Sequence, residues 1–531
     1  MSTNRQLGLC AGVVLAWIEG AAYSQPPGGV HPASVAPASM ARIGTADERY
    51  QSFNIEMVEV TGGRFWKPYG KEVDALLKAP PAAGPVGMDP ALFQRRPPID
   101  LTNPRLRKLA AALGPAYVRV SGTWANNTYF QDSEEAAPAN PPAGFNGVLT
   151  RRQWKGVVDF ARAVDDRIVT SFATGAGTRD ASGVWTPAQA RQFLAYTKSI
   201  GGSIAAAEYM NEPTFAEIGG APKGYDAAAY ARDIAVFRAF VKEATPGMTI
   251  LGPGSVGEGI SLVPAGMANG QLKSEDLLAA AGPAFDAFSY HFYGAVSKRC
   301  AGGAPASGTT PQDALSEEWL ARTGRVEAFY AGLRDRFAPG KPLWVTETAD
   351  AVCGGNPWGS TFLDSFRYLD QLGRLARSGV QVVAHNTLAS SDYGLLDEST
   401  LTPRPNYWSA LLWSRFMGRR VLDPGHPPAP TLHLYAHCLR GHPGGVALLA
   451  INTSRAAPQW LDLPTRSDRY TLTARDLEGA RVELNGNELK LGAGDEMPRL
   501  ADVPTPSGRL TLAPASITFL AIPNANNGSC R

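Results

Sequence analysis

Two glutamates follow apolar segments in a pattern that suggests acid–base chemistry. One apolar run, Ile204–Met210, leads directly into Asn211 and Glu212, and a second run, Leu343–Thr346, leads into Glu347. Two carboxyl groups that face each other can share the hydrolysis of a glycosidic bond, because one protonates the leaving oxygen while the other attacks the anomeric carbon. A single Glu after an apolar run is often only the first residue of a helix, so the pair carries the signal.

The elements that would position this pair alternate along the chain. We expect strands at Phe53–Val60, Ala116–Ser121, Arg167–Phe172, Ile204–Met210, Thr249–Gly252, Ala287–Phe292, Leu343–Thr346 and Val380–His385. The periodicity between them predicts helices at Pro104–Leu113, Arg151–Val164, Pro187–Ile200, Asp226–Ala244, Glu317–Phe337 and Thr361–Ser378. Eight strands separated by helices or long loops predict an α/β fold, a (β/α)8 TIM barrel. Glu212 and Glu347 would then meet at the carboxyl ends of the fourth and seventh strands.

A second pattern begins after Phe416, where short alternating runs are broken by Gly, Pro and Asn. It predicts a smaller C-terminal β-sandwich domain. We therefore expect the catalytic barrel over residues 51–418 and the β-sandwich over residues 419–531. Residues 25–50 would form a linker, with a strand that could join the β-domain. Cys438 and Cys530 could close this domain with one disulfide.

The N-terminal segment indicates the compartment. Residues 1–24 contain Arg5, an apolar run and then small residues, which is the layout of a secretory signal peptide. The apolar run of about a dozen residues is too short to span a bilayer. Cleavage would remove Cys10 and leave four cysteines, an even number suited to an oxidising compartment. We expect a secreted or periplasmic protein without stable membrane insertion; a cytosolic chain with an irregular start is the alternative.

The composition argues against nucleic-acid and metal partners. The 531 residues hold 50 Lys and Arg against 48 Asp and Glu, so a net charge of +2 provides no global field that would attract nucleic acid. There is no Cys-x-x-Cys pair, and His433 and His437 would lie about 13 Å apart on a strand. We expect no metal, no cofactor and no nucleic-acid partner, and we expect a monomer.

Further motifs resemble the heparanase-like β-glucuronidases of glycoside hydrolase family 79. Residues 106–123 (LRKL leading to GPAYVRVSGT) are similar to the second strand and Gly-Thr turn of that family, and residues 289–293 (SYHFY) to its His-x-Tyr segment. The strongest match is DYGLLDE at residues 392–398 followed by PNYW at residues 405–408. Together with Cys438 and Cys530, the resemblance covers nearly all of the chain after the signal segment.

The resemblance implies roles for particular residues. Glu212 would be the acid/base and Glu347 the nucleophile, while Asn211 would hold the 2-hydroxyl of the sugar. His291 and Tyr293 would donate hydrogen bonds around Glu347. Glu56 and Thr123 would contact sugar hydroxyls. The uronate carboxylate would be bound by Tyr393 and the backbone N–H groups of Cys353, Gly354 and Gly355.

One position departs from the family pattern. The family often carries three consecutive glycines in the carboxylate loop, and Cys353 replaces one of them. A disulfide with Cys300 would fix this loop to the segment after the sixth strand. A free buried thiol is the alternative.

These features lead to one expected function and several competing ones. We expect a secreted retaining endo-β-D-glucuronidase that cuts GlcA–GlcNAc bonds in heparan sulfate, with a glycosaminoglycan or another uronate-containing glycan as substrate. An exo-acting β-glucuronidase, which removes terminal GlcA or 4-O-methyl-GlcA, is the main alternative. A non-catalytic carbohydrate-binding barrel would lack one glutamate, and an arabinofuranosidase or β-xylosidase would lack the Gly-rich loop and Tyr393.

Several residues are candidate contacts with a sulfated polymer. Basic pairs that could bind sulfate are Arg95–Arg96, Arg151–Arg152 and Lys298–Arg299. Tryptophans in or near strand-to-helix loops, which could stack on sugars or pack in the core, are Trp124, Trp185, Trp319 and Trp358.

Overall fold

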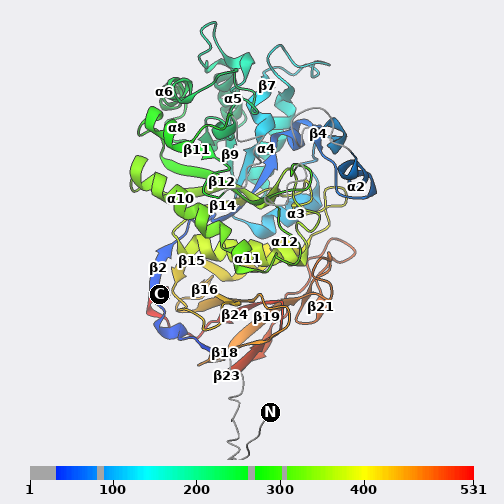
Figure 1. Ribbon diagram of the computed structural model, residues 1–531, viewed down its shortest axis with the longest axis vertical. Coiled ribbons are helices and arrows are strands. Elements are labelled where there is room, and N and C mark those ends of the chain that lie inside the picture. The colour runs from blue at the N-terminus through cyan, green and yellow to red at the C-terminus, as the bar shows by residue number, and fades with distance from the viewer. Residues whose placement is uncertain (1–31, 80–88, 261–269, 302–307) are drawn as a thin grey trace, which may run out of the picture.

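The computed structural model describes residues 32–79, 89–260, 270–301 and 308–531. Figure 1 shows a helix-rich upper part and a lower part made of strands, with α11 and α12 between them. The expected signal segment, residues 1–24 with Cys10, lies outside the described residues. Among the described residues, no helix has the length and apolar character needed to cross a membrane.

The upper part is a closed barrel of eight parallel strands in chain order, as the sequence predicted. They are β3 (Gln51–Glu56), β6 (Tyr117–Ser121), β9 (Arg167–Ser171), β10 (Ile204–Glu208), β11 (Thr249–Ser255), β12 (Ala287–Val296), β13 (Leu343–Val352) and β14 (Val382–His385). β14 pairs with β3 and closes the ring. Short strands flank it: β4 (Gly63–Trp66) with β5 (Phe93–Arg96), and β7 (Thr128–Gln131) with β8 (Gly147–Thr150).

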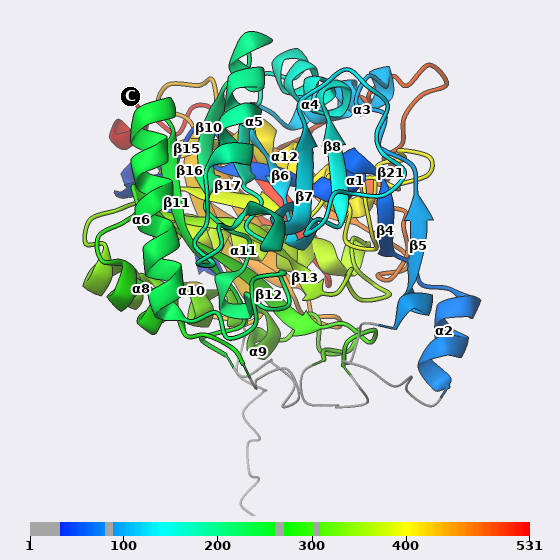
Figure 2. The ribbon, with the colours of Figure 1, turned by 90° about the horizontal axis from the view of Figure 1, so that it is seen from above.

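Helices surround the barrel, and Figure 2 shows α4, α5 and α6 outside the strands. They are α1 (Met57–Thr61), α2 (Lys71–Lys78), α3 (Pro104–Leu113), α4 (Arg151–Ala163), α5 (Ala188–Ser199), α6 (Ala227–Ala244), α8 (Ser274–Ala281), α9 (Glu317–Leu320), α10 (Arg322–Phe337), α11 (Phe362–Arg377) and α12 (Pro405–Phe416). All six predicted helices are present, and the one predicted over Glu317–Phe337 is divided into α9 and α10. The sequence did not predict α1, α2, α8 and α12.

The largest boundary differences from the sequence prediction are at β3, β12 and β13. The first strand was predicted to reach Val60 but ends at Glu56, because α1 begins at Met57 and the side chain of Glu59 accepts a hydrogen bond from the backbone N–H of Glu56 (2.6 Å). β12 and β13 run further than predicted and remain paired to Val296 and Val352. The second catalytic candidate, Glu347, therefore lies within a long strand rather than at its end.

The C-terminal part is a two-sheet sandwich. The larger sheet contains β2 (Arg42–Thr45), β15 (Met417–Leu422), β16 (Leu432–Leu439), β17 (Val446–Asn452), β24 (Ser516–Ile522), β19 (Ser467–Thr473), β20 (Glu483–Leu484), β21 (Asn487–Glu488) and β22 (Val503–Thr505). The smaller sheet contains β1 (Ala33–Ser34), β18 (Gln459–Leu463) and β23 (Gly508–Leu512). β1 and β2 come from the N-terminal side of the barrel. A disulfide joins Cys438 to Cys530, as predicted.

The face of the larger sheet that is turned away from the smaller sheet packs on the barrel through α11 and α12. Nine consecutive residues of α12, Pro405–Trp413, are buried, so this helix is apolar on nearly every side and lacks the periodicity that identifies an amphipathic helix. Asp370 of α11 is the centre of a charged cluster at this contact. Its Oδ1 accepts hydrogen bonds from Tyr435 and His433 of β16 (2.5 Å each), and its Oδ2 accepts one from Arg374 Nε (2.6 Å).

Candidate active site

The structure brings Glu212 and Glu347 together at the barrel mouth. Glu347 comes from β13, and Glu212 follows β10 in a left-handed backbone conformation (φ 51°). Carboxylate oxygens of the two residues lie within 4.8 Å of each other. The side chain of Glu212 is 20% exposed and that of Glu347 is 7% exposed. Glu212 is therefore the carboxyl group more open to solvent.

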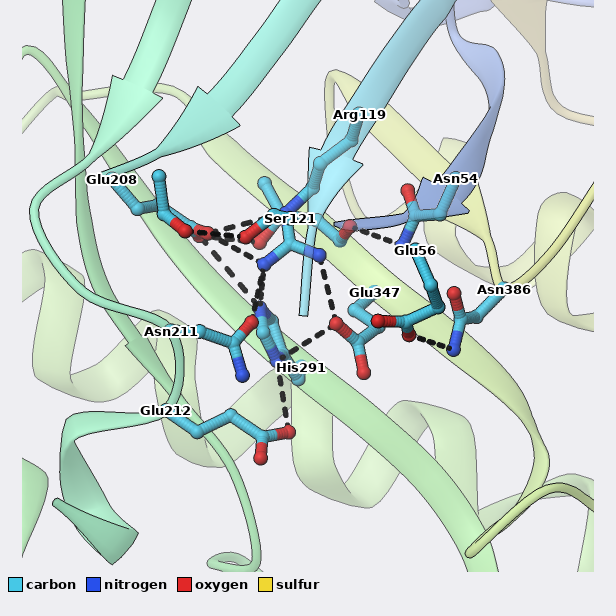
Figure 3. Close-up of polar contacts among 12 residues, drawn as sticks. Asn54, Glu56, Arg119, Ser121, Glu208, Asn211, Glu212, His291, Glu347 and Asn386 are labelled. Carbon is cyan, nitrogen blue, oxygen red and sulfur yellow. Dashed lines mark hydrogen bonds and ion pairs between the residues drawn. The ribbon is translucent and has the colours of Figure 1, made fainter. Parts of the chain in front are cut away.

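His291 of β12 lies between the two carboxyl groups (Figure 3). Its Nδ1 is 3.1 Å from Glu212 Oε1 and 3.7 Å from Glu347 Oε2. Burial opposes charge on this ring, but the Glu347 carboxylate and the hydrogen bonds to Glu208 and Glu212 together outweigh it, and the pKa of His291 rises to about 9. An imidazolium therefore links the two carboxyl groups at neutral pH.

Arg119 of β6 holds Glu347 from the other side. Its Nη1 donates to Glu347 Oε2 (2.7 Å), and its Nη2 donates to Glu208 Oε2 (2.9 Å) and to Asn211 Oδ1 (2.8 Å). The guanidinium is 1% exposed. One buried arginine thus fixes the nucleophile candidate and the amide that precedes the acid/base candidate.

Glu208, the last residue of β10, is the fully buried counter-charge of Arg119. Its Oε1 accepts hydrogen bonds from Ser289 (2.8 Å) and Thr346 (2.6 Å). Although burial alone would raise the pKa of Glu208, Arg119 holds it well below its usual range. This carboxylate has its partners inside the protein and stays ionised.

The two catalytic candidates have pKa values shifted in opposite directions. Burial raises the pKa of Glu212, and the negative charge of Glu347 adds to this shift. Burial would also raise the pKa of Glu347, but the positive charges of His291 and Arg119 lower it, and Tyr293 donates a hydrogen bond to its Oε1 (2.7 Å). One group can therefore hold a proton while the other remains an anion, which is the division of roles that acid catalysis with a carboxylate nucleophile requires.

Asn211 is held in position by its backbone and its side-chain oxygen. Its backbone N–H donates to Asn126 Oδ1 (2.9 Å), and Asn126 Nδ2 donates back to the carbonyl of Asn211 (3.0 Å). Its Oδ1 accepts the hydrogen bond from Arg119. Within the described part of the chain the Nδ2 group of Asn211 has no acceptor, so it can donate to a ligand.

A second group of polar residues surrounds Asn386. The Nδ2 of Asn386 donates to Glu56 Oε1 (3.1 Å), Tyr293 Oη (3.0 Å) and Tyr393 Oη (3.1 Å). Burial and the charge of Glu347 raise the pKa of Glu56 well above its usual range. This part of the site therefore offers two phenols and a carboxyl group whose protonated form is favoured, all beside the nucleophile candidate.

The predicted carboxylate loop is a tight turn directly after β13. Cys353, Gly354 and Gly355 all have positive φ (61°, 81° and 88°), and a Cβ on Gly355 would lie 3.2 Å from Tyr393 and from Asp350. Cys353 forms the predicted disulfide with Cys300. Among the described residues, no acceptor contacts the N–H groups of Gly354 and Gly355.

Other candidates differ in their placement. Thr123 is half-buried at the start of a short 3-10 helix after β6, and the structure shows no side-chain hydrogen bond for it among the described residues. Trp185, Trp319 and Trp358 are buried, so of the four tryptophans only Trp124 is half-exposed. One member of each basic pair contacts an acid: Arg96 with Glu398, Arg151 with Asp132, and Arg299 with Asp392.

Sequence reasoning missed the roles of Arg119, Glu208 and Asn386. Arg119 lies inside an apolar strand segment, where a charged residue is unusual, and this was the available signal. Its partners lie 89 and 228 residues away, so no local spacing identifies them. Asn386, next to the end of β14, had no such signal.

Glu212, His291 and Glu347 are also the one group in the described part of the chain whose donor atoms could surround a metal ion. Arg119 already supplies a positive charge beside Glu347, where a metal ion would have to bind (2.7 Å). This donor set fits proton transfer better than metal binding.

The comparisons with known proteins agree with this geometry. Residues 97–373, just over half of the chain, match the model of the N-terminal domain of glycosyl hydrolase family 79. The chain belongs to glycoside hydrolase family 79. It is therefore a glycoside hydrolase of the heparanase and β-glucuronidase type, as its sequence motifs predicted.

The relatives of this family-79 protein include heparanases and a β-glucuronidase. It is 27% identical to heparanase-like protein 1 of Arabidopsis thaliana over 81% of this chain and 86% of that protein. It is 32% identical to the heparanase of Gallus gallus over 47% of this chain and 49% of that protein. It is 30% identical to the baicalin-β-D-glucuronidase of Scutellaria baicalensis over 41% of this chain and 44% of that protein. A 4-O-α-L-rhamnosyl-β-D-glucuronidase from Fusarium oxysporum shares the fold (TM-score 0.61, 12% identity, 92% of this chain and 100% of that one).

Proposed function

We propose that this family-79 protein is a retaining β-D-glucuronidase in which Glu212 is the acid/base and Glu347 the nucleophile. The separation of the two carboxyl groups carries this proposal. Their oxygens lie within 4.8 Å, whereas retaining enzymes place the two groups roughly 5–5.5 Å apart and inverting enzymes about 6.5–9.5 Å apart to admit a water.

The reaction would proceed in two displacements. Glu347 attacks the anomeric carbon as the bond to the leaving oxygen breaks, and Glu212 gives that oxygen its proton. In the second step Glu212 takes a proton from a water, which attacks the same carbon and releases Glu347. Because Glu347 is an uncharged ester in the intermediate, it no longer raises the pKa of Glu212, and this favours the change from acid to base.

The neighbouring residues support these roles. Tyr293 donates a hydrogen bond to Oε1 of Glu347, and Arg119 donates one to Oε2. The carboxylate is therefore oriented before the substrate arrives. Asn211 would donate its free Nδ2 to the sugar 2-hydroxyl. Glu56 and Thr123 would contact other hydroxyls.

We infer that the turn of Cys353, Gly354 and Gly355, with Tyr393, recognises the uronate carboxylate. Successive backbone N–H groups in such a turn form an anion-binding concavity without a direct arginine contact. The unpaired N–H groups of Gly354 and Gly355 and the Tyr393 hydroxyl support this role.

We further propose that the enzyme acts in the endo mode on heparan sulfate. Support comes from the heparanase-like relatives, one of which matches over 81% of this chain. Two disulfides support a location outside the cytosol, in keeping with the signal peptide proposed for residues 1–24.

The exo mode on terminal glucuronic acid or on small glucuronides is the second candidate. Arg96, Arg151 and Arg299 each contact an acidic residue, so these members of the basic pairs are less available to bind sulfate. A baicalin-β-D-glucuronidase is also among the relatives.

Product sizing separates the two modes. The purified protein would be incubated with heparan sulfate and, separately, with 4-nitrophenyl β-D-glucuronide, and the products sized by gel filtration. A rapid fall in polymer size with little free uronic acid supports the endo mode. Free glucuronic acid from the small substrate with an unchanged polymer supports the exo mode, and no cleavage of either contradicts the β-glucuronidase proposal.

The acid/base role has its own test. Glu212→Gln should slow hydrolysis of a glucuronide with a poor leaving group by about 10²–10⁴-fold, because the leaving oxygen is no longer protonated. The loss should be smaller with 4-nitrophenolate, which leaves without a proton. Added azide should restore turnover and give the β-glucuronyl azide. Equal losses for both leaving groups, without azide rescue, would show that Glu212 has another role.

A further inference from the structure

Arg299 lies directly behind the carboxylate-binding turn. It follows β12, its side chain is 0% exposed, and its guanidinium packs 3.8 Å from the ring centroid of Tyr69. Nη1 donates to the carbonyls of Cys353 (3.1 Å) and Gly355 (3.3 Å), while Nη2 donates to the carbonyl of Lys67. A buried guanidinium that contacts three main-chain carbonyls fixes the backbone around it.

These contacts determine where the N–H groups of the turn point. In a trans peptide the C=O and the following N–H point in opposite directions. The carbonyl of Cys353 faces Arg299, so the N–H of Gly354 points away from the arginine. The carbonyl of Gly354 accepts a hydrogen bond from the backbone N–H of Asp392 (3.1 Å). The N–H of Gly355 therefore points away from Asp392.

Two neighbours of Arg299 hold the same carbonyl segment. The hydroxyl of Ser297 also donates to the carbonyl of Cys353 (3.1 Å). Cys300, the next residue after Arg299, is bonded covalently to Cys353. The segment 297–300 therefore restrains the turn through a hydroxyl, a guanidinium and a disulfide.

Arg299 also balances negative charge beside the turn. Its Nη2 is 2.5 Å from Asp392 Oδ2, and Asp350 lies against Gly355 and accepts the N–H of Asn356 (2.9 Å). Without the guanidinium, the carboxylate of Asp392 would keep only the backbone N–H of Tyr69 (3.4 Å) as a partner, and its uncompensated charge would repel an incoming uronate.

We propose that Arg299 is a positioning residue for uronate specificity: it holds the turn so that the N–H of Gly354 faces the sugar carboxylate, and it cancels the charge of Asp392. This inference rests on the proposed β-glucuronidase function. It concerns a side chain that lies behind the turn and acts on the substrate only through it. Lysine cannot replace it, because a single ammonium cannot contact both the turn carbonyls, which accept from Nη1, and the Lys67 carbonyl and Asp392, which accept from Nη2.

The test compares one sugar with and without its charge. Kinetics would be measured on 4-nitrophenyl β-D-glucuronide and on its methyl ester, which lacks the carboxylate. For the wild type we expect a higher kcat/KM on the acid than on the ester. Arg299→Lys should lower this preference roughly tenfold, mainly through a higher KM for the acid, and Arg299→Met should lower it further because the charge is also lost.

Arg179 provides a matched control. This buried arginine also donates to two main-chain carbonyls, of Thr174 and Gly183, contacts Asp233, and lies 5.0 Å from the ring centroid of Tyr225. Arg179→Lys should lower stability as Arg299→Lys does, but it should leave the acid-to-ester preference at the wild-type ratio.

Each outcome has a distinct meaning. If the wild type does not prefer the acid, the carboxylate-binding role in the proposed function is wrong. If the wild type prefers the acid and Arg299→Lys keeps that preference, the inference about Arg299 is wrong. If Arg299→Lys does not fold, Ser297→Ala replaces it, with an expected loss of acid preference of about 2- to 5-fold, and an unchanged ratio in that variant also overturns the inference.

Discussion

The catalytic centre and the contact between α11 and β16 both bury carboxyl groups beside an arginine and a histidine, but they differ in how completely those groups are hydrogen-bonded. At the α11–β16 contact both oxygens of Asp370 have partners. At the catalytic centre, Glu56 Oε2 and Asn386 Oδ1 have no partner among the described residues, and Glu212 is partly exposed.

This difference separates a group that stabilises the fold from groups kept for a ligand. Burial opposes the charge of Asp370, but His433 and its other donors lower its pKa to about 2. At the catalytic centre, burial and Glu347 raise the pKa of Glu56. A buried carboxylate with a full set of donors stays charged and orders its neighbours, whereas one with too few donors takes up a proton.

The largest effect is expected at the catalytic centre. Glu347→Gln should lower kcat on 4-nitrophenyl β-D-glucuronide by about 10⁴-fold or more, because an amide cannot form the glycosyl ester. Circular dichroism should show the wild-type fold. Turnover within tenfold of wild type would show that another residue is the nucleophile.

At the α11–β16 contact the expected loss is one of stability. Asp370→Asn should lower the free energy of unfolding by about 2–4 kcal/mol, because the cluster loses its buried charge and Arg374 and His433 keep only Glu317, which is 52% exposed. Urea unfolding at neutral pH measures this, and the KM for the small glucuronide should not change.

The control is Asp462→Asn, which removes the partner of Arg509 at the surface, where the aspartate is 35% exposed. This change should cost less than about 1 kcal/mol. If the two variants unfold at the same urea concentration, the buried cluster does not stabilise the contact.

The sequence predicted the barrel well because each barrel strand is a separate apolar run and most of its helices are amphipathic. It missed α12 because this helix lies between the barrel and the sandwich and has no polar face. It overran β3 because Glu56 and Glu59 end the strand through a contact that an apolar run does not reveal.

The candidate site was predictable only where a residue follows a strand or sits in a motif. Glu212 and Glu347 could be found in this way, and the motifs led to His291 and Tyr293. Arg119 joins three other parts of the chain, residues 208–211, His291 and Glu347, and such a network depends on the closed barrel rather than on any local pattern.

The stability of the α11–β16 contact should depend on pH through His433. Asp370 is the main cause that raises the pKa of His433 against the effect of burial, with Glu317 adding to it and Arg374 opposing it. A raised folded-state pKa stabilises the protein below the unfolded value of about 6.5, and this stabilisation is lost as the pH rises through the folded value.

The melting temperature of the wild type should therefore exceed that of His433→Gln by a few degrees at pH 6, and this difference should shrink towards pH 9. His442→Gln, at an exposed position, is the control and should follow the wild type throughout. A difference that is constant with pH would mean that His433 acts through packing and not through its charge.

The smallest effect on stability is expected when the same acid-to-amide change is made at Glu56. Burial and the charge of Glu347 raise the pKa of Glu56 and so favour its neutral acid form; Gln matches that form in charge and size, and its Oε1 can still accept the hydrogen bond from Asn386. Glu56→Gln should change the free energy of unfolding by less than about 0.5 kcal/mol, in contrast to Asp370→Asn. Urea unfolding at pH 7 compares the two variants directly. A loss as large as that of Asp370→Asn would mean that Glu56 is ionised and fully paired, and the distinction between the two clusters would be wrong.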